Sequence, residues 1–560
     1  MTTPEPISRR SFLSRSAVAG GAVLLGAGSA TGLAACSSSS STTSGTKAPS
    51  GTPGVNHGTP KLGGTAIIGN DADIDGFYPP SNHWDNNGFL YANCIYDPLT
   101  AVAADGSIQP YLCQSITPNA DYTQWTMKLR PGILFHDGTA LDATVVKNNY
   151  DALQASLLTG LALKFLDNVT VIDPMTVSFN LNEPYVPLPA GLATQIGYMV
   201  SQSMIDAEKA GNSNPTPVGT GPFLYSSWLP NNHFTAVRNP HYWRSGYPYL
   251  DQITFRPIPD HSQRIATLQS GGVDLIVSTD PVTITQFQGN SSYQVVDSLS
   301  DTLGEPDMSF IMLNCLASPM DDLRIRQALA KGINYPAFAK LFDSGLDLAT
   351  TGLFPEGSKY FSQTGYPTYD PVAAKALVKE YAAQNGTPTF DLATVTDARL
   401  VRVTEVLQSM WQDIGCKVNL QAIEQAQLIS NTIVGNYQAV TYEQFAAPDP
   451  SINYVWWSTT TVAPVGKIAL NFARNSDPQI ESALVTGRSS SNPADVVAAY
   501  QKVNERLAVD LPYLWLGRTP WSAVADSRIQ NFAGTILPEG MPGKGFDNGS
   551  FFSTQIWMEG

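Results

Sequence analysis

Few residues of this 560-residue chain are spaced for chemistry. The six histidines, at positions 57, 83, 136, 233, 241 and 261, are scattered, and no two are spaced as a zinc-binding pair. Asp321 and Asp322 are an adjacent pair of carboxylates, but a helix cap is the role we expect for them. The chain has no G-x-S-x-G, H-E-x-x-H or G-x-x-x-x-G-K-[ST] motif. We therefore predict no catalytic residues, no metal site and no cofactor.

The first 35 residues have the pattern of an export signal. Arg9 and Arg10 precede Ser-Phe-Leu, and an apolar stretch follows over about residues 17–30. The stretch is too short and too rich in glycine for a membrane-spanning helix. The paired arginines match the twin-arginine export signal; an ordinary secretion signal with two chance arginines is the alternative.

Cys36 is the residue for which we predict a covalent modification. Leu33-Ala34-Ala35-Cys36 resembles the lipobox of bacterial lipoproteins. This resemblance implies cleavage before Cys36 and a diacylglycerol on its sulfur. Residues 36–60 are rich in Ser, Thr, Gly and Pro, which predicts a flexible tether. We thus expect a body lipid-anchored to the outer face of the cell membrane.

The composition excludes some partners. The net charge of −15 argues against nucleic acid and against a basic membrane-binding patch. The aromatic content of 10% suits a ligand cavity lined with rings. Cys94, Cys113, Cys315 and Cys416 allow three disulfide pairings, among which the sequence does not decide; Cys94 and Cys113 are the nearest in sequence.

Strand and helix patterns alternate along the body. Residues 63–70 and 124–130 read as strands, and 88–100 reads as a helix. Asp142 and Asp370 stand where N-caps are expected, and Pro371 falls in the first turn of the second of these helices. This alternation predicts an α/β fold in which helices cover sheets.

Four separated stretches, in order, carry a family resemblance. Residues 129–146 ("LRPGILFHDGTALDATVV"), 217–243 ("PVGTGPFLYSSWLPNNHFTAVRNPHYW"), 267–278 and 312–334 match motifs of the extracellular solute-binding proteins of ABC importers, of the peptide/nickel type, solute-binding protein family 5. The resemblance covers most of residues 60–560.

The resemblance implies a two-lobed, type II periplasmic-binding-protein-like fold with an extra subdomain. Two lobes joined by a hinge would close over solute. Lobe I is expected over residues 61–305 plus 515–560, and lobe II over 306–514.

The residues of these motifs also predict local structure, independently of the family resemblance. Gly219, Thr220, Gly221 and Pro222 predict a structural turn in which positive φ is open to the glycines. His136 is expected to form hydrogen bonds at a strand end rather than to bind a ligand. Tyr242 and Trp243 are expected to pack into lobe I.

Two stretches match regions that contact solute in the family. In residues 79–89, Trp84 and Asn86 fall at those positions. In residues 440–457, Tyr442, Gln444 and Ala446 would share one face of a strand to which a peptide can add as a further strand.

Three further residues complete the candidate site. Asp449 is either a ligand contact or a turn former. Trp457 and Trp515 could stack on solute, although the sequence favours a core position for each.

One position departs from the family pattern. Peptide-binding members often carry an aspartate, which holds the ammonium group of the peptide, where this chain has Ala446. Blocked peptides, oligosaccharides, opines and metal chelates therefore stay open as solutes beside oligopeptides.

The function predicted is that of a monomeric substrate-binding receptor that delivers solute to an ABC permease and ATPase complex. A sensory binding protein of the same fold is the alternative, and a secreted hydrolase is a further one.

Overall fold

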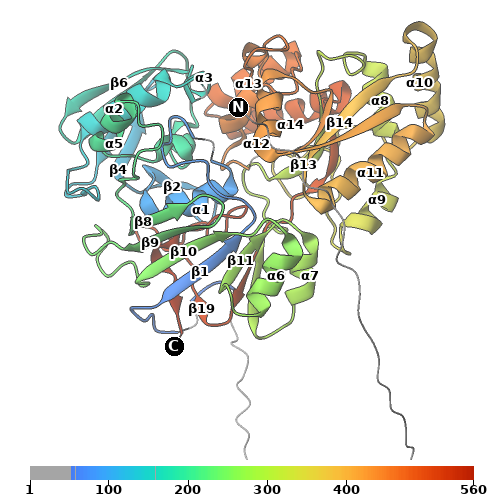
Figure 1. The fold of residues 1–560 in the computed structure, drawn as a ribbon. Helices are drawn as coiled ribbons and strands as arrows, with labels where there is room; N and C mark the ends of the chain where they lie inside the picture. Colours follow the sequence, from blue (N-terminus) through green and yellow to red (C-terminus); the bar gives the residue numbers. More distant parts are fainter. Residues whose placement is uncertain (1–51, 57, 83, 158, 445, 560) are drawn as a thin grey trace, which may run out of the picture. The chain divides into compact units, whose positions relative to one another are not determined.

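The computed structural model describes residues 52–56, 58–82, 84–157, 159–444 and 446–559. The predicted export signal and Cys36 lie outside these residues. The body contains three sheets of four or more strands, with helices packed on them, and is of the α/β class (Figure 1).

Lobe I is built on a seven-stranded sheet. Its strands, in spatial order, are β12 (Tyr293–Asp297), β18 (Ser522–Asp526), β11 (Leu275–Ser278), β1 (Thr65–Asn70), β10 (Gln252–Pro257), β9 (His233–Arg238) and β8 (Phe223–Leu229). β1 runs parallel to both β10 and β11. Side chains along β11 alternate between the two faces of this sheet. Leu275 and Val277 belong to the buried cluster that contains α1 (Asn86–Ile95). Ile276 belongs to the cluster on the other face, under α6 (His261–Gln269) and α7 (Pro281–Phe287).

A four-stranded antiparallel sheet forms the extra subdomain. It has the order β4 (Cys113–Pro118), β5 (Gln124–Leu129), β7 (Thr176–Leu181), β6 (Leu166–Asp173). Its helices are α2 (Ala143–Ala155), α3 (Thr159–Ala162), α4 (Leu188–Gly191) and α5 (Gln202–Lys209). Two short antiparallel pairs stand apart from the larger sheets: β2 (Thr100–Val102) with β3 (Ile108–Pro110), and β19 (Ile529–Gln530) with β20 (Trp557–Met558).

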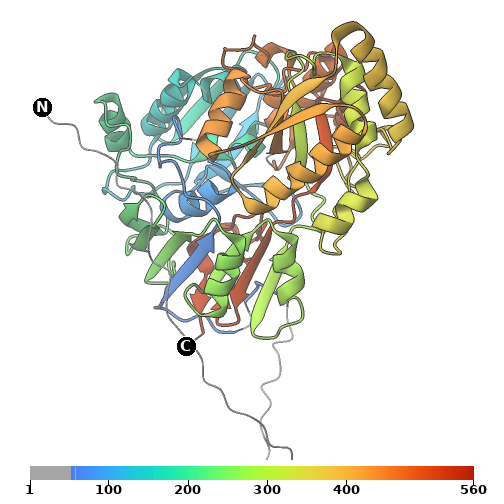
Figure 2. The ribbon, with the colours of Figure 1, turned by 45° about the vertical axis from the view of Figure 1, so that its right-hand side comes forward.

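Lobe II is built on a five-stranded sheet. The order is β15 (Lys417–Ile423), β14 (Thr389–Val395), β16 (Ala439–Gln444), β13 (Met308–Leu313), β17 (Tyr513–Arg518). Its helices are α8 (Leu323–Gly332), α9 (Tyr335–Phe342), α10 (Pro371–Asn385), α11 (Ala398–Asp413), α12 (Gln425–Val434), α13 (Pro478–Ser489) and α14 (Pro493–Asp510). Figure 2 shows the long helices α10 and α11 beside this sheet.

The chain passes twice between the two large sheets. The first crossing joins β12 to β13, and the predicted boundary at residue 305 falls inside it. The second lies between Arg518 and Ser522, because β17 still pairs with β13. The predicted boundary at residue 515 therefore falls inside a lobe II strand, and Trp515 lies with lobe II.

The tether is shorter than predicted. Gly54 is buried, and its backbone N–H donates to Gln294 Oε1 at 2.9 Å. Ala533 N donates to the Gly54 carbonyl at 2.7 Å, and Trp557 Nε1 donates to Asn56 Oδ1 at 3.2 Å. The chain is thus packed on lobe I from Gly54, before the predicted end of the tether at residue 60.

The helix caps predicted from neighbouring residues are confirmed, because a cap depends only on residues close in sequence. Asp142 accepts from Val145 N at 2.9 Å, and Asp370 accepts from Ala373 N at 2.9 Å, so both are the N-caps predicted. Asp322, rather than Asp321, caps α8 by accepting from Arg324 N. Cys94 and Cys113 are both buried free thiols, so no disulfide joins them.

Candidate solute-binding site

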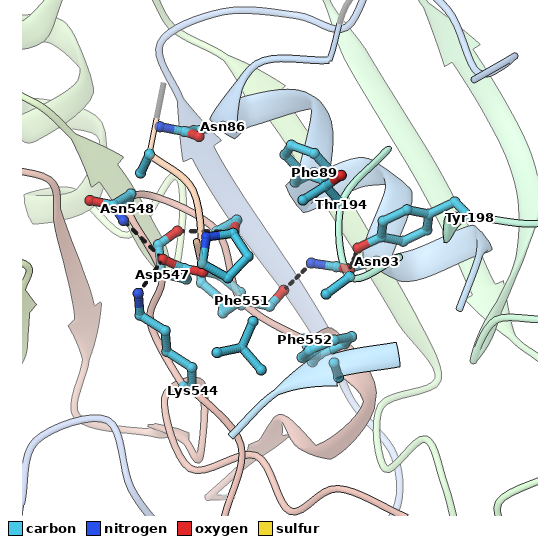
Figure 3. Close-up of a pocket in the computed structure, with 17 residues that line it drawn as sticks. Asn86, Phe89, Asn93, Thr194, Tyr198, Lys544, Asp547, Asn548, Phe551 and Phe552 are labelled. Atoms are coloured by element: carbon cyan, nitrogen blue, oxygen red, sulfur yellow. Dashed lines mark hydrogen bonds and ion pairs between the residues drawn. The ribbon is translucent and has the colours of Figure 1, made fainter. Parts of the chain in front are cut away.

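A cavity of about 90 Å³ lies between the two lobes. Its lobe I wall includes Asn86 and Phe89 of α1, together with Lys544, Asp547 and Phe551 from the last part of the chain (Figure 3). Its lobe II wall is Ala446 and Pro448, just after β16. We call this space the interlobe cavity. Its lining combines aromatic rings with amides and charged groups, as solute sites commonly do.

The start of α1 is fixed by a cap. Asp85 accepts from Gly88 N at 2.9 Å, which satisfies one of the free N–H groups of the first turn. Burial raises the pKa of the Asp85 carboxyl to about 6. The cap places Asn86, the first residue of the helix, on the interlobe cavity.

The end of α1 is held by the motif at residues 217–243. Asp97 is 1% exposed and accepts hydrogen bonds from three residues of that motif. They come from Trp243 Nε1 at 2.8 Å, Tyr242 OH at 3.0 Å and Thr220 Oγ1 at 3.2 Å. Tyr242 and Trp243 thus belong to lobe I, as predicted, and the motif positions the helix that lines the cavity.

The glycines of that motif are required for close approach and not for positive φ. Neither Gly219 nor Gly221 uses the positive φ that is open to glycine. A Cβ on Gly219 would lie 2.1 Å from the Ile95 carbonyl oxygen, and one on Gly221 would lie 2.5 Å from the Ile95 carbonyl carbon. His136 reinforces the junction, because its Nδ1 accepts from Gly219 N at 3.4 Å and its Nε2 lies 3.0 Å from the Gly221 carbonyl oxygen.

Polar groups are prearranged on the lobe I side of the interlobe cavity. Asn93 donates to the Phe551 carbonyl at 3.2 Å and accepts from Tyr198 OH at 2.6 Å. Lys544 pairs with Asp301 at 2.8 Å and Asp547 at 2.9 Å. Burial disfavours the charge of Lys544, but the two carboxylates outweigh it and raise the pKa of its ammonium.

Strand β16 leaves part of one edge unpaired in the sheet. It pairs with β13 along its whole length, but with β14 only at Ala439 and Val440. Ala447, beyond its end, forms an isolated bridge with Glu305. The second half of β16 and the residues after it thus lead into the interlobe cavity with no β14 partner.

The face predicted to be shared along β16 is only partly observed. Tyr442 and Gln444 do line one space together, a cavity of about 10 Å³ inside lobe II. Glu443 lines it too, although simple alternation would turn it away. Ala446 lies beyond the end of the strand and lines the interlobe cavity instead.

The predicted tryptophans are buried. Trp84 is 7% exposed; its Nε1 donates to the Gly76 carbonyl at 3.0 Å, and its ring stacks on Tyr96. Trp457 and Trp515 are 2% and 1% exposed, and neither lines the two cavities described. Contact of these rings with solute stays a prediction.

Asp449 shows the turn-forming role that the sequence left open. Its side chain accepts from Ser451 N at 2.8 Å and caps the 3-10 helix Pro450–Trp456. The carboxylate thereby fixes where the chain leaves the interlobe cavity after Pro448. Whether Asp449 also contacts solute stays a prediction.

A buried carboxylate that sequence reasoning missed links the two crossings. Asp307 is 3% exposed and accepts from Trp521 Nε1 at 2.8 Å and from Thr519 Oγ1 at 3.2 Å, both in the second crossing. It also accepts from Asn86 Nδ2 at 3.1 Å. Asp307 thus connects both crossings to a residue that lines the interlobe cavity. Its partners come from distant segments, so no spacing signal marked it.

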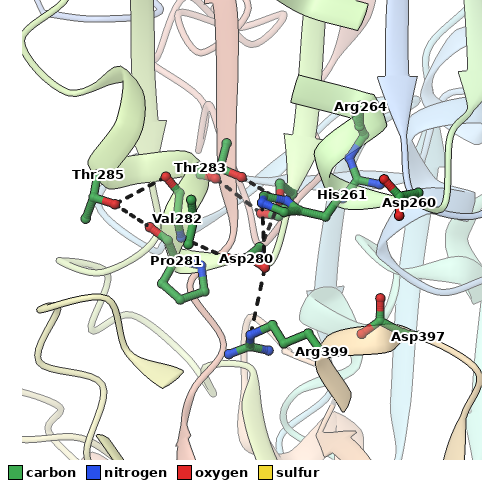
Figure 4. A network of polar contacts seen from close by, with 12 residues as sticks. Asp260, His261, Arg264, Asp280, Pro281, Val282, Thr283, Thr285, Asp397 and Arg399 are labelled. Carbon is green, nitrogen blue, oxygen red and sulfur yellow. Dashed lines mark hydrogen bonds and ion pairs between the residues drawn. The ribbon is translucent and has the colours of Figure 1, made fainter. Parts of the chain in front are cut away.

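Ion pairs join the lobes away from the cavities. Arg488 of lobe II lies 3.0 Å from Glu183 of the extra subdomain, and its carbonyl accepts from Val186 N at 2.8 Å. On the other side, Asp280 at the start of α7 lies 3.9 Å from Arg399 of lobe II (Figure 4). The two lobes are therefore in direct contact on both sides of the crossings.

The described residues contain no group of three or more His, Cys, Asp or Glu side chains placed to hold a metal ion. In that same part of the chain, no helix is long and apolar enough to cross a membrane.

Comparison with known proteins places the chain in a family. Residues 107–464, more than half of the chain, match the family model of the bacterial extracellular solute-binding proteins, family 5. The chain belongs to this family. Members of family 5 are non-enzymatic binding components of ABC transporters, which agrees with the prediction that the protein is not an enzyme.

Relatives and solved structures extend the likeness over most of the body. The glutathione-binding protein GsiB of Pectobacterium atrosepticum is 26% identical over 80% of this chain and 87% of its own length. GsiB of Escherichia coli K12 is also 26% identical, over 76% of this chain and 83% of its own.

Two solved structures share the fold. The periplasmic binding protein DppA of Helicobacter pylori, in complex with the peptide STSA, superimposes with a TM-score of 0.78 at 21% identity, covering 89% of this chain and 99% of that one. The oligopeptide-binding protein AppA of Bacillus subtilis, in complex with a nonapeptide, gives 0.76 at 19% identity, covering 90% and 100%. Both confirm the type II periplasmic-binding-protein fold.

Proposed function

We propose that this protein is the substrate-binding receptor of an ABC importer, held to the outer face of the membrane by lipid on Cys36. It captures an oligopeptide or peptide-like solute between its lobes and delivers it unchanged to a permease and ATPase complex. The observation that carries the proposal is the interlobe cavity, which is walled by α1 of lobe I and by the chain after β16 of lobe II.

The cavity supports a peptide-like solute in particular. An extended backbone finds hydrogen-bonding partners on a strand that lacks a neighbour, independently of its side chains. The second half of β16 has no β14 partner, and its continuation lines the cavity. The names of two relatives specify glutathione, and DppA was solved with a tetrapeptide, so peptide-like solutes are the first to test.

A thermal-shift experiment tests the proposal. The body with Cys36→Ser is unfolded and refolded to remove any carried solute, and is then heated with libraries of di- to pentapeptides and with oligosaccharides. At a solute concentration 100 times its Kd, binding stabilises the folded protein by about 2.7 kcal/mol, which is readily detected. Failure of every library to raise the melting temperature would contradict the proposal.

A matched pair of variants locates the binding. Ala446→Trp places a large ring in the interlobe cavity and is expected to abolish the shift. Ala498→Trp adds the same ring at an exposed position of α14 and should leave it intact. An unchanged shift in Ala446→Trp would place the solute elsewhere.

Anchoring is tested separately. Replacement of Cys36 by serine in the full chain should move the protein from the membrane fraction to the medium, because acyl chains supply about 0.8 kcal/mol per buried CH₂. Retention at the membrane would contradict a lipid on Cys36.

A further inference from the structure

A carboxylate of lobe I is shared between a histidine of the same lobe and an arginine of lobe II. Asp280 Oδ2 lies 3.7 Å from Nε2 of His261, the first residue of α6, and 3.9 Å from Nε of Arg399, in the first turn of α11. In Figure 4, His261 and Arg399 approach Asp280 from opposite sides. The two side chains therefore compete for one oxygen atom, and only Arg399 belongs to the opposite lobe.

The position of Asp280 is fixed by the helix that it caps. Its Oδ1 accepts from Val282 N at 2.8 Å, and Pro281 occupies the first turn of α7. The backbone N–H of Asp280 donates to Ser278 Oγ at 3.1 Å, at the end of β11. Because Oδ1 is used within lobe I, Oδ2 is the oxygen that faces lobe II.

Arg399 is positioned by lobe II. Asp397 caps α11 by accepting from Leu400 N at 2.8 Å, which fixes the first turn that carries Arg399. The charges of Asp343 and Glu443, both in lobe II, also interact with Arg399. An arginine side chain keeps its charge throughout the physiological pH range, so this half of the contact does not titrate.

His261 is the side chain in this contact whose charge changes near neutral pH. Burial lowers the pKa of its ring, Asp280 and Asp260 act to raise it, and Arg264 and Arg399 lower it further. Its Nδ1 is buried and has no hydrogen-bond partner among the described residues, so a proton on this nitrogen finds no acceptor. The contact observed between the lobes is therefore the one that suits a neutral His261.

Opening of the lobes changes the surroundings of His261 in one direction. Arg399 leaves with lobe II, whereas Asp280, Asp260 and Arg264 stay beside His261 in lobe I. Removal of a like charge favours protonation, so the open protein binds a proton at His261 more readily than the closed protein does. By linkage, a fall in pH through the range in which His261 titrates shifts the protein towards the open form.

We propose that Asp280 and Arg399 form a latch between the lobes, and that protonation of His261 weakens this latch, so that acidification promotes release of the solute. This rests on the proposed function and deepens it by naming a regulation of the same site. At neutral pH, Arg399 pairs with Asp280 beside an uncharged imidazole, and the lobes stay closed over the solute. At acidic pH, the imidazolium pairs with Asp280 Oδ2 and repels Arg399.

Solute affinity at two pH values tests the latch. Calorimetry measures the Kd of the solute that most raises the melting temperature of the refolded body, at pH 7.5 and at pH 5.5. The readout is the ratio of the two Kd values, compared between the wild type and His261→Gln, because the buried carboxyls of Asp307, Asp343 and Glu443 remain in both proteins. We expect this ratio to be about two- to fivefold larger in the wild type than in His261→Gln, the size of one partly exposed ion pair. His241→Gln, at an exposed position of lobe I, is the matched control and should keep the wild-type ratio.

Replacement of the arginine gives a second, independent test. Arg399→Gln should raise the Kd at pH 7.5 by about two- to fivefold, because the latch is lost while the solute site is untouched. In the Arg399→Gln background, His261→Gln should no longer change the ratio between the two pH values. Arg402→Gln, at an exposed position of α11, is the control and should bind as the wild type does.

The outcomes separate the latch from the receptor function. Equal ratios in the wild type and His261→Gln would overturn the latch and leave the receptor function standing, as would an Arg399→Gln variant that binds as tightly as the wild type at pH 7.5. Failure of every solute to bind at either pH would overturn both.

Discussion

The burial of Asp97 gives a prediction whose size follows from the structure. In Asp97→Ala the donors of Trp243, Tyr242 and Thr220 all lose their acceptor. A buried donor left unpaired costs about 1–3 kcal/mol, and these three share one site, so we expect a loss of about 3–5 kcal/mol in the free energy of unfolding. Asp97→Asn keeps an acceptor and removes the charge, so it should cost far less near pH 7.

The two variants also differ in their response to pH. Burial, despite those hydrogen bonds, raises the pKa of Asp97 to about 6, above its ordinary value of 3.8. As pH rises, the unfolded chain loses this proton before the folded protein does. The Asp97 carboxyl therefore contributes most to the free energy of unfolding below pH 4, and this contribution falls by about 3 kcal/mol by pH 6. Asp97→Asn has no titrating group at this position, so its free energy of unfolding should rise relative to that of the wild type over the same pH interval.

Urea unfolding followed by tryptophan fluorescence, at pH 4.5 and pH 7, measures both effects. The reasoning fails if Asp97→Ala unfolds within 1 kcal/mol of the wild type, since the motif at residues 217–243 would then not anchor the end of α1. It also fails if Asp97→Asn and the wild type have parallel pH profiles.

Three other predictions concern contacts between lobes, the glycine junction and the thiols. Glu183 and Arg488 lie 3.0 Å apart across the lobes, and the Glu183 side chain is 38% exposed. Solvent screening therefore limits the contribution of this ion pair to solute affinity to about 1 kcal/mol, near fivefold. A double-mutant cycle with glutamine at each position, measured by calorimetry, gives the coupling energy, and a value of zero would contradict closure through this pair. Gly219→Ala should cost at least 1–3 kcal/mol in urea unfolding, because its Cβ would meet the Ile95 carbonyl; a variant as stable as the wild type would refute the close approach. In a Cys36→Ser body, a thiol reagent should find four free thiols in urea and react slowly with the native protein; fewer than four in urea would reveal a disulfide.

Sequence reasoning succeeded where the cause is local. A carboxylate before a helix caps it wherever the helix goes, so Asp142 and Asp370 were identifiable. The ordered motifs similarly identified the family and the fold. The reason for Gly219 and Gly221 was not identifiable, because the atoms that exclude a side chain belong to Ile95, which is remote in sequence.

The site was only partly predictable for the same reason. Asn86 and Ala446 were expected from the resemblance, and both line the interlobe cavity. Glu443 was overlooked because alternation along β16 assigned it to the other face, whereas it lines the same small cavity as its neighbours. Asp307 becomes recognisable only when both crossings are folded together, since its partners Thr519 and Trp521 come from the second crossing.

The most direct test of the central claim is a crystal structure of the refolded body with the library peptide that raises its melting temperature most. We predict the peptide between Asn86 and Phe89 of α1 and the chain at Ala446, extended along the second half of β16. A bound peptide outside the space between the lobes, or cleaved in the crystal, would contradict a receptor that encloses its solute and releases it unchanged.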